Sequence, residues 1–271
     1  MKQTLTSILL ALALVASGAA FAERPAISID GDVVVDYAVE IDVDVDVDAG
    51  GNMVGQYVDQ STIKAKSVVM YNDLSQSRKV TVDATAVGNN ADLADGLVDN
   101  VVQSVQDSDI VAVSLVNRNL INPRANVKVT STAVGNNLIL DVAPGFYPPG
   151  GPSQNPNVGG GATVVQLVEG TDVKAVSTLN GNTFGCWWCN VVDPTVESVA
   201  VGNLADLTVL NSEKNGVPFN STPISVTQFT IAGSNVSALS TMIGNRGRIG
   251  PVNVNSTSIG NSLSVSAPSV R

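Results

Sequence analysis

Histidine is absent from the 271 residues of this chain. Because His is the commonest general base and the commonest zinc ligand, its absence excludes Ser-His-Asp and Cys-His catalysis and most zinc hydrolase chemistry. Basic residues are also scarce, with 14 Lys and Arg against 24 Asp and Glu and a formal net charge of -10. Nucleic-acid binding requires a basic surface, so we expect no nucleic-acid partner.

Aromatic residues make up 4% of the chain and charged residues 14%. The remainder is rich in Val, Thr, Ser, Asn and Gly. Val and Thr favour strands, whereas Asn and Gly favour tight turns. The composition therefore predicts many short strands with a thin interior, and it indicates no cofactor.

The first residues have the order of a secretory signal peptide. Lys2 precedes an apolar run at 8–15, and the small-residue motif Ala20-Phe21-Ala22 follows. This pattern predicts cleavage after Ala22, and the apolar run is too short to span a bilayer. We expect a secreted protein that is extracellular, on the cell surface or associated with an outer membrane.

A ten-residue unit ending in Gly-Asn recurs along the chain. The fullest copies are VTVDATAVGN at 80–89 and VKVTSTAVGN at 127–136, and further copies lie at 173–182, 236–245 and 252–261. A shorter copy ends at Gly202-Asn203, and two degenerate copies end at Tyr71-Asn72 and Arg118-Asn119. The predicted turn residues are Gly88, Asn89, Gly135, Asn136, Gly181, Asn182, Gly202, Asn203, Gly244, Asn245, Gly260 and Asn261.

Each unit alternates apolar and polar residues, as a half-buried strand does. We expect Gly88 to supply a positive φ at a corner, and we expect strand, Gly-Asn corner and strand to form roughly one coil. Neighbouring anchors lie about 16 to 21 residues apart, a period typical of a solenoid. The predicted fold class is all-β, a β-solenoid of stacked coils in which aligned Asn side chains form ladders. The alternative is a β-sandwich.

The sequence divides into five regions. We assign 1–22 to a signal peptide, 23–60 to an acidic N-terminal strand region, 61–142 to a first repeat block, 143–162 to a Pro/Gly-rich loop and 163–271 to a second repeat block. Between Asp92 and Asp109, apolar residues recur at helical spacing, which predicts one short helix; these residues are Leu97, Val101, Val102 and Val105.

Two further clusters are candidate sites. Alternation places Asp42, Asp44, Asp46 and Asp48 on one face of a strand, which makes them weak calcium candidates or a solvated edge that blocks unwanted pairing. Cys186 and Cys189 flank two tryptophans. They form either a possible disulfide that staples a corner or a redox pair, and no helical pattern follows them.

The segments STAVGNNLILDV at 131–142 and STSIGNSLSVSA at 256–267 resemble repeats of exported bacterial surface proteins. They are similar to curlin-type fibre subunits and, more closely, to holdfast-anchoring proteins of stalked alphaproteobacteria. The resemblance implies export through a curli-type outer-membrane pore, surface anchoring, and assembly with itself or with related subunits. Curlin repeats carry Gln at fixed positions, whereas Gln in this chain is interpreted as sparse and out of register.

We therefore expect a non-enzymatic structural protein that forms or anchors extracellular adhesive material, with extracellular polysaccharide as a further possible partner. One alternative is a calcium-dependent carbohydrate-binding module that uses Trp187, Trp188 and the Asp run. Another is a β-helix enzyme acting on polysaccharide, which would need clustered carboxylates. Acids in the repeats, such as Asp83 and Glu197, stand singly.

Overall fold

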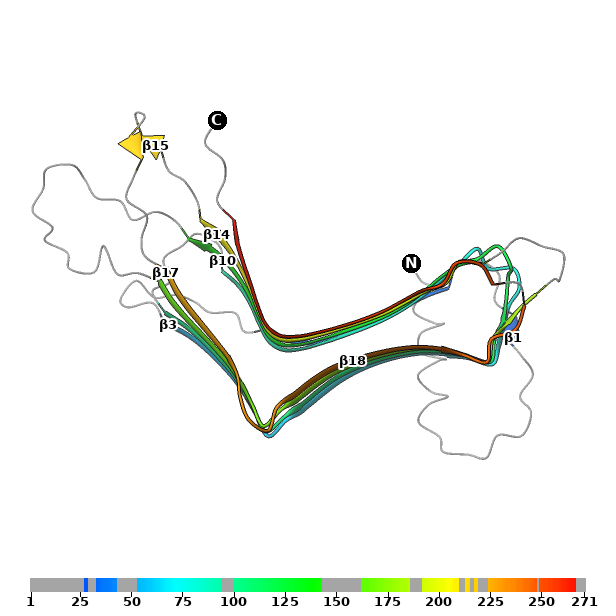
Figure 1. Cartoon of the computed structure of the whole chain (residues 1–271), viewed down its shortest axis with the longest axis horizontal. Helices are drawn as coiled ribbons and strands as arrows, with labels where there is room; N and C mark the ends of the chain where they lie inside the picture. The colour runs from blue at the N-terminus through cyan, green and yellow to red at the C-terminus, as the bar shows by residue number, and fades with distance from the viewer. Residues whose placement is uncertain are drawn as a thin grey trace, which may run out of the picture.

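The described part of the chain is built from strands. The computed structural model describes residues 27–28, 33–42, 53–93, 100–142, 162–185, 192–209, 213–214, 217–218, 224–247 and 249–266. Within these ranges there is no helix, and hence none long and apolar enough to cross a membrane. Nearly all strands pair in parallel with segments far away in sequence (Figure 1).

Four parallel sheets contain most of the strands. Sheet A contains β1 (Ile27–Ser28), β5 (Asn72–Leu74), β9 (Leu120–Ile121) and β13 (Thr183–Phe184). Sheet B contains β2 (Val33–Asp42), β6 (Lys79–Leu93), β10 (Asn126–Val142), β14 (Thr195–Val209) and β19 (Asn253–Ser266). Sheet C contains β3 (Met53–Asp59), β7 (Asn100–Gln106), β11 (Ala162–Glu169) and β17 (Ile224–Thr230). Sheet D contains β4 (Thr62–Met70), β8 (Asp109–Asn117), β12 (Asp172–Asn180) and β18 (Asn235–Ile243).

The chain passes through the sheets in a fixed order, B to C to D to A and back to B. We call one such passage a coil. Two departures from this order occur among the described residues. β15 (Glu213–Lys214) and β16 (Val217–Pro218) form an antiparallel pair, and between β18 and β19 the chain makes only isolated bridges, such as Thr183 with Arg246, in place of a sheet A strand. The expectation of stacked parallel strands is confirmed, and the arrangement is consistent with a solenoid.

The coil is longer than the repeat spacing predicts. Asn89 and Asn136 occupy equivalent places in successive coils and are 47 residues apart. The next step in the same column, from Asn136 to Asn203, covers 67 residues. The expectation of one coil for each strand–corner–strand unit of 16 to 21 residues is therefore wrong.

The reason is that each complete coil contains two copies of the repeat. One set of copies lies on β6, β10, β14 and β19 and stacks within sheet B, and the other lies on β4, β8, β12 and β18 within sheet D. The two sheets contact each other across a thin core, as β6 does with β4 and β8. Copies that are neighbours in sequence thus face each other, and copies one coil apart stack.

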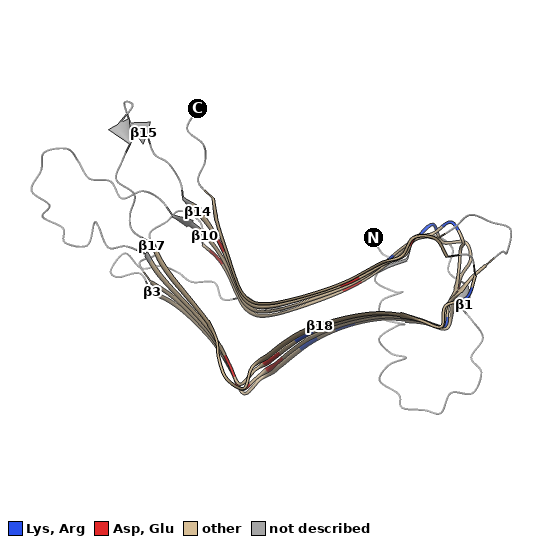
Figure 2. Cartoon of the chain, in the orientation of Figure 1, with Lys and Arg blue, Asp and Glu red and all other residues tan. Residues whose placement is uncertain are grey.

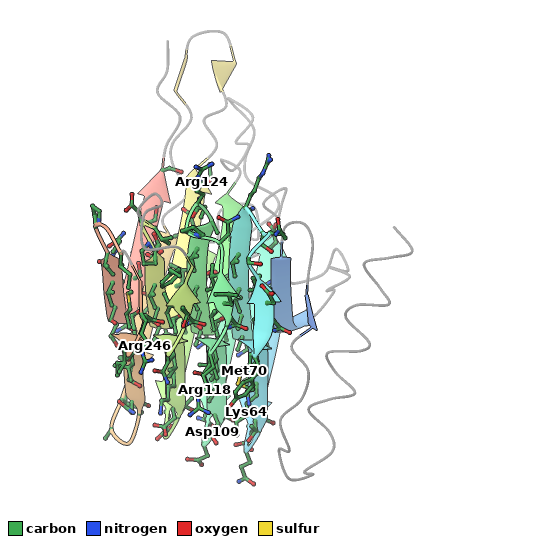
Figure 3. The ribbon with its side chains drawn as sticks, turned by 90° about the vertical axis from the view of Figure 1, so that its right-hand side faces the viewer. Lys64, Met70, Asp109, Arg118, Arg124 and Arg246 are labelled. Atoms are coloured by element: carbon green, nitrogen blue, oxygen red, sulfur yellow. The ribbon has the colours of Figure 1, made fainter. Side chains whose placement is uncertain are left out.

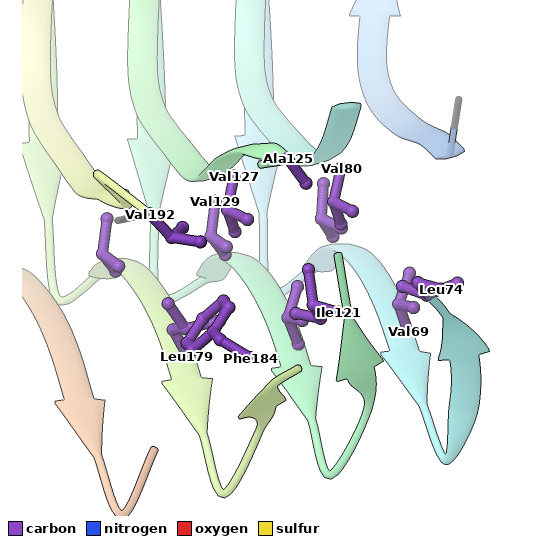
Figure 4. Packing of buried hydrophobic residues seen from close by; sticks show 13 residues of the cluster. Val69, Leu74, Val80, Ile121, Ala125, Val127, Val129, Leu179, Phe184 and Val192 are labelled. Carbon is purple, nitrogen blue, oxygen red and sulfur yellow. The ribbon is translucent and has the colours of Figure 1, made fainter. Parts of the chain in front are cut away.

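Small apolar side chains fill this core. The alternation predicted for one face of β6 is observed, since Val80, Val82, Ala84 and Ala86 are fully buried. Near the corner formed by sheet A, larger residues join them, including Leu74, Ile121 and Phe184 (Figure 4). Because each inward residue stacks on an equivalent one in the next coil, narrow side chains suffice to exclude water.

The predicted short helix is not present in the described residues of its segment. Residues 100–106 form β7, which pairs with β3 on one side and β11 on the other. Val101, Gln103 and Val105 alternate inward and are buried, so the apolar pattern has a period of two in this stretch. Pairing with two neighbouring coils overrides the local helical spacing.

Several predicted regions lie outside the described residues. These include the signal peptide at 1–22 and residues 143–161 of the Pro/Gly-rich loop, whose last residue, Ala162, begins β11. In the acidic N-terminal region, β1, β2 and β3 are described. β2 pairs with β6 in sheet B, where repeat copies stack, whereas β3 pairs with β7 in sheet C and β1 with β5 in sheet A.

Candidate functional site: polar ladders and the C-terminal end

A ladder of Asn side chains runs through sheet B. Each Asn donates a hydrogen bond from its Nδ2 atom to the Oδ1 atom of the Asn in the next coil, at 2.7 Å. The ladder runs from Asn89 through Asn136 and Asn203 and ends at Asn261. The same amides donate to backbone carbonyl oxygens of sheet C at 2.8 to 2.9 Å, for example from Asn136 to Leu167. Each buried amide group is therefore bonded both along the stack and across the core.

The glycines before these Asn residues act through close approach. Gly88, Gly135, Gly202 and Gly260 lie within strands, and none has a positive φ, so the expected role of Gly88 is wrong. A Cβ atom at Gly88 would lie 2.5 Å from the carbonyl oxygen of Gly135, and one at Gly135 would lie 2.4 Å from that of Gly202. The stacked backbones leave no room for a side chain at Gly88, Gly135 and Gly202, whereas a Cβ atom at Gly260, in the last strand, would lie 3.7 Å from Thr230 Oγ1.

A second Asn ladder lies where sheet D turns into sheet A. Asn119 donates to Asn182 at 3.0 Å and Asn182 donates to Asn245 at 2.9 Å. The preceding residues have positive φ in every coil: 57° at Tyr71, 54° at Arg118, 63° at Gly181 and 64° at Gly244. The degenerate copies thus place Tyr and Arg where the fuller copies have Gly.

The two non-Gly residues at this corner contact each other. The Arg118 guanidinium lies over the Tyr71 ring, 5.6 Å from its centroid, and donates to the Tyr71 hydroxyl at 2.9 Å. Figure 3 shows the position of Arg118 on the stack. Nearby, the Asp73 carboxylate accepts a hydrogen bond from the backbone N–H of Ser75 at 3.0 Å. Hydrogen bonds from the Ser75 side chain and backbone hold the pKa of Asp73 below its ordinary value.

A glutamine ladder was missed by sequence reasoning. Gln103 Nε2 donates to Gln56 Oε1 at 2.6 Å, Gln166 donates to Gln103 at 2.7 Å, and Gln228 donates to Gln166 at 2.7 Å. The interpretation that Gln is out of register is therefore wrong. The available signal was spacing: Gln228 precedes Asn261 by 33 residues, and Gln56 and Gln103 precede Asn89 and Asn136 by the same distance.

Serines connect the two facing sheets. Ser177 of sheet D donates to the backbone oxygen of Glu197 in sheet B at 2.6 Å. Ser67, Ser114 and Ser240 make the equivalent bond to carbonyl groups in their own coils. Glu197 therefore contributes a backbone acceptor to the core while its side chain lies on the strand's other face.

The last strands of the stack form an end face that we call the C-terminal end face, made of β17, β18 and β19. Val265 is 59% exposed and Leu263 49%, whereas Leu207, which stacks beneath Val265, is 1% exposed. The sequences of these three strands contain no charged residue. Charged positions lie instead on earlier strands and near the sheet A corner (Figure 2).

The opposite end differs in three ways. Inward residues of β3 and β4 are buried, with Val58 and Ile63 only 4% and 5% exposed. The edge of sheet A is occupied by β1, which pairs with β5. In β2 the register shifts between Glu40 and Asp42, opposite Asn89 of β6.

The other sequence-predicted residues are not brought together by the described structure. Asp42 ends β2, whereas Asp44, Asp46, Asp48, Cys186 and Cys189 lie outside the described residues, as do both tryptophans. Within the described ranges, no three His, Cys, Asp or Glu residues are grouped so that they could hold a metal ion.

Comparisons with known proteins identify no relative. No family model matches the chain, and neither a curated protein nor a solved structure matches it.

Proposed function

We propose that this chain is a β-solenoid that acts as a secreted structural protein at the cell surface, either a subunit of a fibre or an anchor for extracellular adhesive material. Its action would be the stacking of β-coils against those of related surface subunits. Export through a curli-type outer-membrane pore and contact with extracellular polysaccharide belong to the same proposal.

The observation that carries the proposal is the combination of in-register ladders with an uncovered, uncharged end face. In stacked repeats each unit buries its apolar face against the next one, so the last unit needs a cap or a partner. Edge strands that avoid pairing usually carry charges, and β17, β18 and β19 have none. This end therefore favours addition of another coil.

The competing functions gain no comparable support. The calcium-binding and carbohydrate-binding alternatives depend on residues that, apart from Asp42, lie outside the described ranges. In the column that contains Asp83 and Glu197, the uncharged Thr130 lies between these two acids, although Asp36 lies opposite Asp83. Asp109 and Asp172 also lie opposite each other, and both are exposed. We therefore propose a structural function without a catalytic step.

The test is made in cells that produce the protein. A short epitope is added after Arg271, and intact cells are labelled with gold-conjugated antibody, with a cytoplasmic marker protein as the negative control. We expect label on the outer surface, and loss of cell attachment to a solid support when the gene is deleted. Label found only after permeabilisation, or full attachment by the deletion strain, would overturn the proposal.

A further inference from the structure

We propose that this chain receives a partner at one end only. The C-terminal end face binds a parallel β-coil of a different chain that carries Gln and Asn at the ladder positions, and the N-terminal end binds no further copy. The protein thus ends a stack as its anchor and does not repeat within it. This inference rests on the proposed function and chooses between its two forms.

The first step is the difference in burial between the ends. At the C-terminal end face, inward positions that are buried in the two preceding coils are open, as at Val265 and Leu263. At the N-terminal end, Val58, Ile63 and Ala65 are as buried as residues in the middle of the stack. Among the inward side chains that the structure describes at the two ends, only those of the C-terminal end face offer apolar surface that a partner coil would remove from water.

The second step is the direction of the ladders. In both Asn ladders the amide of one coil donates to the Oδ1 atom of the next coil toward the C-terminus. In the Gln ladder the amide donates in the opposite direction, so Gln228 Oε1 is the atom to which the next coil would donate. A partner must therefore present Asn Oδ1 at the positions above Asn245 and Asn261, and Gln Nε2 above Gln228.

The third step excludes head-to-tail stacking of identical chains. A copy placed on the N-terminal end cannot pair with all of its edge strands, because sheet B contains five strands whereas sheets C and D contain four. If β19 of the copy paired with β2, no strand of the copy would lie beside β3 and β4, which follow β2 in the chain. The register shift in β2 also falls opposite Asn89, so the sheet B ladder would be interrupted at every junction. A different chain without these features continues the ladders at lower free-energy cost.

The fourth step excludes a symmetric dimer through two C-terminal end faces. A two-fold axis would reverse the strand direction and make the new pairing antiparallel. Only a residue on the axis would then lie opposite its equivalent, so Gln228, Asn245 and Asn261 could not all meet their like. The ladders thus favour a parallel partner.

The experiment uses the full chain without residues 1–22 and a ¹⁵N-labelled peptide of residues 224–266 as the probe. This peptide holds Gln228, Asn245 and Asn261 at their native spacing. Hydrogen exchange is followed by mass spectrometry, where the isotope label separates the peptide from the chain. We expect excess peptide to slow exchange in β17, β18 and β19 at least tenfold and to leave β3 and β4 unchanged.

Matched controls make the result specific. A peptide carrying Gln228→Glu, Asn245→Asp and Asn261→Asp should give no protection. In the chain, Val265→Lys places a charge on the exposed end and should abolish protection, whereas Thr62→Lys on an exposed position of β4 should not change it. Because both replaced residues are exposed, we expect both variants to remain folded.

Several outcomes would overturn the inference. Protection of β3 or β4 would show that the N-terminal end binds, and filaments of the chain alone in negative-stain images would show head-to-tail stacking. Protection of the C-terminal end face without peptide would indicate a symmetric dimer. Equal protection by the two peptides would show that the partner does not need Gln and Asn at the ladder positions. Each result leaves the surface-labelling test of the proposed function unaffected, so the two failures are distinguishable.

Discussion

At the scale of single residues, the fold depends on side chains that can both donate and accept hydrogen bonds. An amide side chain placed above an identical one bonds to it without any change of geometry, so Asn and Gln extend from coil to coil. Asn136 shows this fully, because it bonds to Asn89, Asn203 and the Leu167 carbonyl while completely buried. Its replacement must leave several buried polar groups without partners.

We expect Asn136→Ala to lower the free energy of unfolding by roughly 2 to 4 kcal/mol, since unpaired buried polar groups cost about 1 to 3 kcal/mol each. Urea unfolding followed by circular dichroism measures this change. Asn235→Ala is the control, because Asn235 is exposed, and it should shift the value by less than about 0.5 kcal/mol. Equal effects of the two substitutions would contradict a structural role for the ladder.

The Gln ladder gives a prediction that depends on pH. In the unchanged chain, the buried Gln103 amide donates hydrogen bonds to Gln56 Oε1 and to the Asn137 carbonyl oxygen. In Gln103→Glu an ionised carboxylate has no hydrogen to donate, so its oxygen would face these two acceptors and repel them. Its pKa in the folded state should rise above the unfolded value of about 4.3, which makes the variant more stable as pH falls through the raised pKa. Melting temperatures between pH 4 and 8 test this.

The control for that experiment is Gln76→Glu, at an exposed turn position. It should follow the pH profile of the unchanged chain. If both Glu variants follow that profile, the buried contacts of Gln103 do not exist in solution.

Gly135 gives a prediction from close approach. A Cβ atom there would overlap the Gly202 carbonyl, and because that oxygen belongs to a stacked backbone it cannot move aside. We expect Gly135→Ala to destabilise the fold by about 3 kcal/mol or more. Gly185→Ala is the matched control, since its nearest neighbour would lie 3.7 Å away, an ordinary contact. Thermal unfolding of the two variants should differ clearly, and similar curves would refute the close approach.

At the scale of elements, the sequence predicted strands and their inward faces but not which strands stack. The alternation of Val80, Val82, Ala84 and Ala86 and the parallel stacking follow from period two and from repetition. Local patterns carry no information on whether neighbouring copies stack or face each other, because both arrangements bury the same residues. The helical spacing around Val101 failed for the same reason, since pairing with two other coils decides the conformation.

The roles of individual residues were less predictable. Glycine is required at position 88 because the backbone of Gly135 approaches it closely, and not because φ is positive there. This contact is with a residue 47 positions away in the chain, so the local sequence does not reveal it. The Gln ladder required comparison at the spacing of whole coils, which a search anchored on Gly-Asn did not make.

The connection from β10 to β11 provides the prediction for an element. Leu140 pairs with Leu93, and Thr163 pairs with Asn100, so residues 141–162 join the same two points as residues 94–99 one coil earlier. Replacing 141–162 with the sequence of 94–99 should therefore preserve the fold. Because loop-closure entropy varies slowly with length, we expect unfolding free energy to change by only about 1 kcal/mol. Loss of cooperative unfolding would contradict the equivalence.

At the scale of the whole molecule, stacking gives the protein two unlike ends. At the N-terminal end the inward residues of β3 and β4 are buried and the register of β2 is irregular, whereas the C-terminal end face has exposed inward residues, no charge and a regular register. Long-range pairing in register makes every coil depend on its neighbours, so stability is shared along the stack. The unlike ends give that stack a direction, and the proposed anchoring role uses it.

The most direct measurement of the central claim, that coils 47 or more residues long stack in register, is disulfide trapping. In a Cys186→Ser, Cys189→Ser background, Lys64→Cys is combined with Val111→Cys, its register partner one coil away, or with Val113→Cys, displaced by two residues. In-register strands place Cα atoms about 4.8 Å apart, within the range for a disulfide, whereas the displaced pair exceeds about 7 Å. We predict rapid cross-linking of the first pair alone under mild oxidation; equal cross-linking of both pairs, or preference for the second, would contradict the stacking.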